Sequence, residues 1–166
     1  MIRTTNLVMK DMADLVPGEL IRHSFGGAAG LMVFMGTQEN GEYLLGVLKS
    51  DAFETPMVWY SSSAKGKTLS YGAEWVIEEI HGPETACGNL YAQSQAHLFI
   101  DGESLVWRFS AGRGRFGFQS LYFILASGSY SEIGKDAAPI AKWRVWESVE
   151  KHADGGEPLL EFGVSE

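Results

Sequence analysis

The chain contains only one cysteine, Cys87, among its 166 residues. A single cysteine excludes an intramolecular disulfide and any metal site built from cysteine alone within one chain. The four histidines, His23, His81, His97 and His152, lie at no short spacing that would form a ready pair of metal ligands. We therefore expect no metal and no cofactor. The alternative is a metal site whose ligands are distant in sequence and are brought together by folding. The cysteine content is also consistent with a reducing, cytoplasmic location.

Long apolar runs are missing as well. The longest one, at 121–126, is far shorter than the roughly 20 residues that span a bilayer. Near the N-terminus only three consecutive residues are apolar, Leu7 to Met9, whereas a secretory signal has an apolar core of about 7–15 residues. The sequence therefore predicts a soluble protein without a membrane partner.

Positive charge is scarce. The formal net charge is −8, which argues against nucleic acid as a partner, because phosphate binding depends on concentrated positive charge. The imbalance is greatest at residues 147–166, where six acidic residues against one lysine give a net charge of −5. Residues 101–146 carry six basic and four acidic residues, a net charge of +2, so a local basic face is compatible with the sequence.

Most of the chain alternates short apolar segments with glycine-containing turns, the pattern of β-strands. We predict an all-β domain over 1–148, either an antiparallel β-barrel or a β-sandwich of about nine strands, with one short N-terminal helix at 10–18. Turns at Asn40–Gly41 and at residues 101–103 predict hairpins. The predicted strands are 19–25, 31–36, 43–50, 56–61, 68–80, 90–100, 104–110, 116–127 and 140–148.

Two segments leave alternatives open. Apolar residues in 68–80 suit a helix, but their alternation and the aromatic side chains favour a strand. The acidic tail, residues 149–166, either docks through Leu159, Leu160 and Phe162 or stays mobile.

The segment 61–68 partly matches a phosphate-binding loop, since Gly66, Lys67 and Thr68 have the required spacing. Ser61 replaces the first glycine of that motif, and the residues after Thr68 favour a strand where the motif requires a helix. Asp101, at the end of an apolar strand, would be the magnesium ligand. We favour a lysine-rich hairpin turn over nucleotide binding.

The segment 112–117 places Arg113 and Arg115 among three glycines. Guanidinium groups and open backbone amides bind phosphate or carboxylate, although the same residues also make an ordinary turn. His23 stands at a strand end before a glycine loop. His23, His97, Arg113 and Arg115 are accordingly the candidate ligand-binding residues.

Trp143 and Trp146 are three residues apart, so in a regular strand they point to opposite faces of the sheet. We expect one of them to be exposed or to lie in a subunit interface, where tryptophan is enriched. An exposed aromatic side chain also suits stacking on a ligand ring.

These observations predict a non-catalytic module that binds a small anionic or aromatic-stacking ligand or a protein partner, as a homo-oligomer. The alternative is an enzyme whose site is assembled at a barrel mouth from dispersed histidine, arginine and acidic residues.

Overall fold

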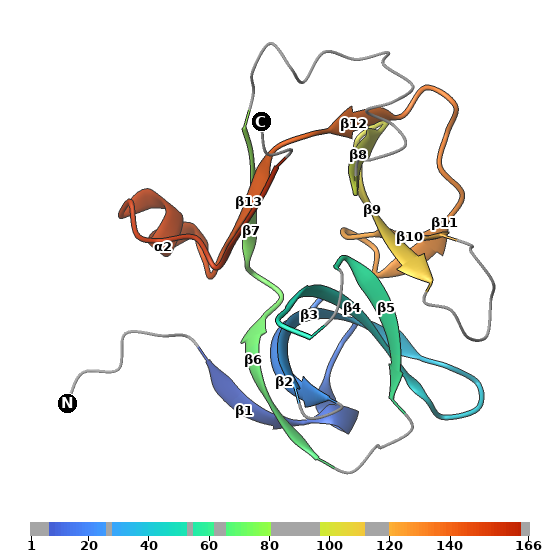
Figure 1. The fold of residues 1–166 in the computed structure, drawn as a ribbon, viewed down its shortest axis with the longest axis vertical. Coiled ribbons are helices and arrows are strands. Elements are labelled where there is room, and N and C mark those ends of the chain that lie inside the picture. The colour runs from blue at the N-terminus through green and yellow to red at the C-terminus, as the bar shows by residue number, and fades with distance from the viewer. Residues whose placement is uncertain are drawn as a thin grey trace.

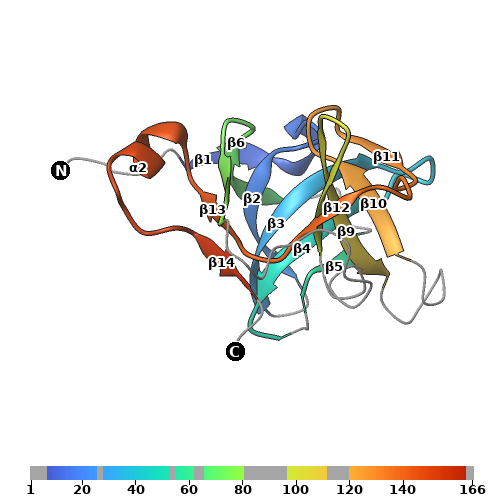
Figure 2. The ribbon, with the colours of Figure 1, turned by 90° about the horizontal axis from the view of Figure 1, so that it is seen from above.

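A computed structural model describes residues 7–25, 28–52, 55–61, 66–80, 97–111 and 120–163. The fold is mostly β, as predicted, and Figure 1 shows two groups of strands. Strands β1 to β6 curl around one end of the molecule, and the strands after β6 occupy the other end. A short helix, α2, projects from one side in both Figure 1 and Figure 2.

The strands form two sheets. The small sheet has the order β14-β13-β7, with β7 (Val76–Glu79), β13 (Trp143–Trp146) and β14 (Leu160–Phe162). The large sheet contains β1 (Val8–Asp11), β2 (Leu20–Phe25), β3 (Ala28–Thr37), β4 (Tyr43–Ser50), β5 (Met57–Ser61), β6 (Lys67–Gly72), β8 (Leu98–Asp101), β9 (Ser104–Ala111), β10 (Ser120–Ile124), β11 (Ser129–Ser131) and β12 (Ala138–Ile140).

The large sheet follows the order β1-β6-β2-β3-β4-β5-β9-β10-β11, and β8 pairs with both β9 and β12. Its pairs are antiparallel except for β5 and β9, which run parallel over two residue pairs. Neither sheet is closed, so the structure does not show a closed barrel. The described residues form fourteen strands, more than the nine predicted. The predicted strand 68–80 divides into β6 and β7, and β1, β11, β12 and β14 form where the sequence predicted a helix, a loop and the tail.

The central strands β3 and β4 are buried on both faces, which explains their uninterrupted apolar sequences. Leu31, Val33 and Met35 face one core, whereas Met32 and Phe34 face the other. We call the first the major core; it also contains Leu20, Leu44, Leu48, Val58, Tyr71, Leu98, Trp107, Phe109, Phe123, Ile140, Trp143, Val145 and Leu160. We call the second the minor core; it also contains Met12, Leu15, Ile21, Tyr43, Leu45 and Val47.

Both predicted hairpins are confirmed. Strands β3 and β4 pair up to Thr37 and Tyr43, and Gly41 in their turn has φ of 79°. Strands β8 and β9 pair up to Asp101 and Ser104, and Gly102 between them has φ of 61°. Glycine adopts these positive φ angles without steric penalty, so the turn chemistry alone located both hairpins.

The predicted N-terminal helix at 10–18 is wrong. Residues up to Asp11 form strand β1 on β6, and only a 3₁₀ turn, η1 (Met12–Asp14), follows. An isolated helix of this length is marginal, whereas the extended path buries Met12 and Leu15 in the minor core. Tertiary packing therefore outweighs the local helical pattern.

Buried Glu19 fixes this N-terminal segment to the sheet. Its carboxylate accepts hydrogen bonds from Lys10 Nζ at 2.9 Å, Val16 N at 3.2 Å and Ser70 Oγ at 2.5 Å. Burial alone would raise the pKa of Glu19, but these donors and the charge of Lys10 outweigh it and hold that pKa below its ordinary value.

The C-terminal tail docks through residue 163, the first of the two alternatives. Its helix α2 (Val149–Ala153) follows β13 directly, and β14 then adds to the free edge of β13. Leu160 is buried in the major core, with Leu159 and Phe162 packed against it.

Candidate functional site

A cleft of about 1040 Å³ lies between the bend that joins β6 to β7 and the segment that leads into α2. Residues 71–76 form one wall, and residues 147–151 with Asp154 form the other. The two walls are far apart in sequence, and the pairing of β7 with β13 brings them together. The cleft therefore depends on the small sheet.

The first wall exists because the predicted strand 68–80 breaks into β6 and β7. Gly72, at the end of β6, has φ of 85°, which only glycine adopts readily. Its amide donates to Ser70 Oγ at 2.9 Å. Beyond the break, Trp75 Nε1 donates to the carbonyl of Gly18 at 2.8 Å, which fixes the indole at the edge of the cleft.

The second wall is the start of α2. Ser148 caps the helix, and its hydroxyl accepts from Lys151 N at 3.3 Å. A hydrogen bond from the Ser148 side chain lowers the pKa of the Glu150 carboxyl. The cap is itself buried, so the start of α2 is anchored to the body of the protein, whereas none of the residues of the helix itself is buried.

The cleft is negatively charged. Four lining residues are acidic, Glu74, Glu147, Glu150 and Asp154, and one is basic, Lys151. The formal charge of the lining is therefore 1 − 4 = −3. An anion would be repelled from this cleft, whereas a cation would be attracted.

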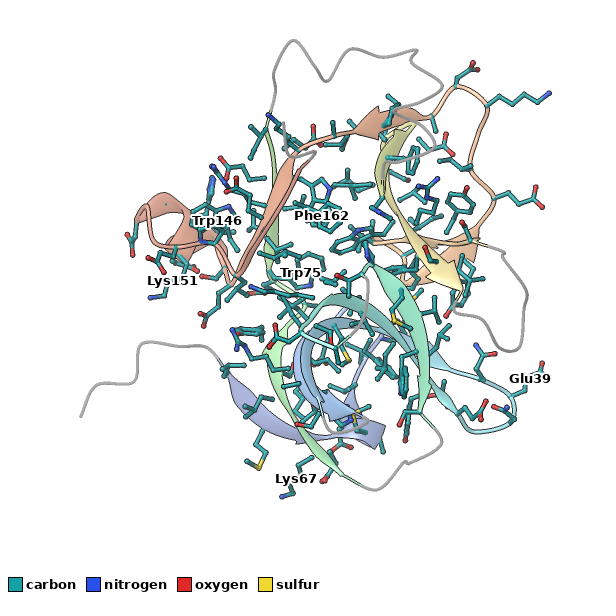
Figure 3. All side chains as sticks on the ribbon, viewed as in Figure 1. Glu39, Lys67, Trp75, Trp146, Lys151 and Phe162 are labelled. Atoms are coloured by element: carbon teal, nitrogen blue, oxygen red, sulfur yellow. The ribbon has the colours of Figure 1, made fainter. Side chains whose placement is uncertain are left out.

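Trp75 connects the cleft to the aromatic part of the major core. Its ring stacks on Trp107 with centroids 5.8 Å apart, and Trp107 contacts Trp143 edge to face at 4.9 Å. Trp143 in turn stacks on Phe162 at 5.0 Å. Figure 3 shows Trp75 and Phe162 on the interior side of the small sheet, and Trp146 and Lys151 on the side of α2. The indole that borders the cleft is thus held by other aromatic rings.

The predicted ligand-binding histidines are not brought together by the sheet order. His23 is half-buried on β2, opposite Gly30, and burial lowers its pKa. His97 precedes β8, and strands β3, β4, β5 and β9 separate β2 from β8 in the sheet order. Arg113 and Arg115 lie outside the described residues, so their anion site stays a prediction.

His97 is half-buried. Its ring contacts Phe162 edge to face at 5.2 Å. Burial, together with the positive charge of Arg108, lowers its pKa. Among the described residues, Nδ1 of His97 and Nε1 of Trp107 are buried polar atoms without a hydrogen-bond partner. Each such atom carries a desolvation cost.

Both predicted interface tryptophans are buried by this chain's own residues. Trp143 is 0% exposed and Trp146 is 6% exposed. The expectation that one of them is exposed is wrong, because β14 and α2 pack beside them. Their predicted role in a subunit interface stays a prediction.

The described end of the predicted phosphate-binding segment does not have the structure that the motif requires. Lys67 and Thr68 begin strand β6, where the motif requires a helix, and Thr68 Oγ1 donates to the carbonyl of Arg22 at 2.9 Å. Asp101 accepts a hydrogen bond from Gly134 N at 2.8 Å. The favoured hairpin turn is wrong too, because β5 pairs with β4 and β9, whereas β6 pairs with β1 and β2.

Comparisons with protein families, with curated proteins and with solved structures found no match. Within the described ranges no group of three or more His, Cys, Asp or Glu side chains is placed to hold a metal ion. In the same part of the chain, no helix has the length and apolar character needed to cross a membrane.

Sequence reasoning missed the cleft, although two signals for it were present. The segment 70–75 contains Gly72, and a glycine inside a strand pattern often marks a bulge or bend. Residues 147–166 carry the strongest negative charge. Nothing in the sequence shows that these two segments meet, because that depends on the long-range pairing of β7 with β13.

Proposed function

We propose that this protein is a non-catalytic binding module whose binding site is the cleft between the β6–β7 bend and α2. The observation that carries the proposal is the combination of a cleft of about 1040 Å³ with a fixed indole, Trp75, on one wall. Ligand sites are typically concave, combine apolar surface with a few polar groups, and are largely formed before binding.

The charge of the lining selects the class of ligand. With a net formal charge of −3 beside an aromatic ring, the cleft favours a positively charged group, from a small molecule or from a lysine or arginine of a protein partner. Cations are attracted both to carboxylates and to the face of an indole. The homo-oligomer and the cytoplasmic location predicted from the sequence remain part of this proposal.

The proposal is tested by NMR titration of the ¹⁵N-labelled protein at pH 7. The cationic probes are the amides of N-acetyl-arginine and N-acetyl-lysine, and the anionic probes are acetate and inorganic phosphate. We expect the cationic probes to shift the indole signal of Trp75 and the amides of 147–151, with weaker binding at high salt. We expect the anionic probes to leave these signals unchanged.

Two matched double variants distinguish the effect on binding of charge in the cleft from the effect of the net charge of the protein. Glu74→Gln with Asp154→Asn removes two charges from the cleft, and we expect binding to weaken on the order of tenfold. Glu39→Gln with Glu103→Gln removes two exposed charges from turns elsewhere, and we expect affinity close to that of the wild type. Equal losses in both doubles, or cationic probes that bind away from the cleft, would show that the cleft is not the site.

A further inference from the structure

The helix that forms one wall of the cleft is attached to the sheet by few contacts. None of the five residues of α2 is buried. Its described side-chain contacts with the small sheet come from His152, whose ring lies against Trp146 with centroids 5.1 Å apart. His152 Nε2 also lies 3.7 Å from Glu78 Oε1 on β7. One titratable side chain thus connects α2 to both β7 and β13.

Glu78 is positioned to receive a charge from His152. Its carboxylate accepts a hydrogen bond from Trp146 Nε1 at 3.0 Å and lies 3.6 Å from Arg144 Nη1. Arg144 is shared, because its Nε donates to Glu161 Oε2 on β14 at 2.7 Å. Glu78 is therefore held in place by β13 and presents its second oxygen to α2.

We propose that His152 is a proton-operated latch, which fastens α2 to the small sheet when it is protonated and releases it when it is neutral. The protonated imidazole forms an ion pair with Glu78, whereas the neutral imidazole keeps only the ring contact with Trp146. The carbonyl end of α2, where His152 lies, also favours a cation. The other charged groups on these elements are Arg144 on β13, Glu161 on β14, Glu79 on β7, and Lys151 and Glu150 on α2.

The direction of the pH effect follows from the charge of the histidine. Histidines ordinarily take up a proton between about pH 5 and 8, so the latch is closed at the acidic end of this range and open at the alkaline end. The pair is partly exposed, with side-chain exposures of 41% for His152 and 31% for Glu78. We therefore expect a modest effect, an opening of α2 that is about two- to fivefold more frequent at pH 8 than at pH 5.5.

The latch is tested on the protein without any ligand. Amide protection factors of α2 and the ¹⁵N signal of the Trp146 indole are measured by NMR from pH 5.5 to 8, with correction for the intrinsic exchange rate. We expect protection at Asp154 N, which donates to the carbonyl of Glu150 in the last turn, to fall about two- to fivefold as the pH rises.

Two variants of the pair and one remote control make the test specific. His152→Gln keeps a polar side chain but removes the charge, and Glu78→Gln keeps an acceptor for Trp146 but removes the partner charge. We expect both to abolish the pH dependence of α2, and we expect His23→Gln on β2 to preserve it. A pH dependence that survives in His152→Gln, or its absence in the wild type while the His152 ring titrates, overturns the latch.

The effect of the latch on ligand binding rests on the proposed function of the cleft, whereas the latch itself does not. When the cationic probes bind, we expect their affinity to change between pH 5.5 and 8 in the wild type and to change less in His152→Gln. Failure of the probes to bind, with the pH dependence of α2 intact, would refute the binding function alone. Binding at an α2 that does not respond to pH would refute the latch alone.

Discussion

The two cores lie on opposite faces of the same strands, yet they are built differently. The minor core consists mainly of aliphatic and methionine side chains and is covered by η1 and the residues after it. The major core contains Trp107 and Trp143, whose rings contact each other edge to face, and it includes residues from strands of both sheets. The buried residues of the minor core therefore all come from Met12 to Val47, whereas those of the major core come from segments between Leu20 and Leu160.

The cleft borders the major core and not the minor core. Trp75 borders it and stacks on Trp107 in the major core, and the wall formed by α2 follows β13 directly. The minor core contributes no residue to the cleft lining. We therefore expect damage to the major core to disturb binding as well as stability, and damage to the minor core to affect stability first.

The largest expected effect is that of Trp143→Ala. Removal of a fully buried indole leaves a cavity and should lower the free energy of unfolding by about 3–5 kcal/mol. Met32→Ala in the minor core should cost about 2–3 kcal/mol, because less side chain is lost. Urea unfolding followed by circular dichroism measures both.

Size-exclusion chromatography of the same Trp143→Ala sample distinguishes a role of Trp143 in the core from a role in a subunit interface. A role of Trp143 in the core alone predicts that the oligomeric state stays that of the wild type while stability falls. Wild-type stability with a changed oligomeric state would instead make Trp143 an interface residue.

Glu19→Gln should come next, at about 1.5–3 kcal/mol, because hydrogen bonds to a charged acceptor are lost or weakened. The ionised carboxylate has a lowered pKa, so its contribution is complete above the ordinary value of 4.5 and is lost as the pH falls below it. Unfolding measured from pH 3 to 7 should show a smaller acid-dependent loss in the variant. Glu103→Gln, in an exposed turn, serves as the control, and a similar loss there would contradict the role of Glu19.

Gly46→Ala tests how tightly the major core is packed. A Cβ at Gly46 on β4 would lie 2.6 Å from Phe109 Cε1 and 3.0 Å from Met35 Sδ. We expect a loss of about 1–3 kcal/mol from overpacking. Gly66→Ala is the matched control, since a Cβ there meets nothing within 4 Å. Equal thermal stabilities for the two variants would mean that the side chains around Phe109 move to accommodate the added methyl group.

The smallest expected effect is the pH dependence contributed by the half-buried histidines His23 and His97. Burial lowers the pKa of His23 and, together with Arg108, that of His97. The unfolded chain then binds protons more readily, so stability is complete above the ordinary value of 6.5 and falls as the pH drops below it. The latch on His152 has the opposite sign, so the measurement belongs in the His152→Gln background. There, His97→Gln should flatten the dependence between pH 7 and 5.

The parts of the fold that depend on neighbouring residues could be predicted from the sequence. The parts that depend on pairing between distant strands could not. The short apolar run at 43–48 located β4, and the glycines at 41 and 102 located two hairpins, because these features depend on neighbouring residues only. The helix at 10–18 failed because burial of Met12 in the minor core outweighed a local pattern. Thr68 was placed correctly in a strand, but its partners were not.

The candidate site was less predictable than the fold. The indole of Trp75 and the carboxylate of Glu150 meet only through the pairing of β7 with β13, and no local signal encodes that pairing. Histidine is a chemically versatile residue type, but His97 is half-buried and its ring packs against Phe162. Chemical type identified candidate residues, and the topology determined which of them meet.

The late pairing of β7 has a consequence for synthesis of the chain on the ribosome. Strands β2 to β5 pair with their neighbours in sequence and can assemble as they emerge. In the described part of the chain β7 pairs only with β13, where Ile77 lies opposite Val145. Until β13 has been synthesised, Val76 and Ile77 belong to an apolar segment without its strand partner, and such segments invite aggregation. A nascent chain arrested before β13 should therefore be a chaperone substrate, even though β2 to β5 already have their sequence neighbours to pair with.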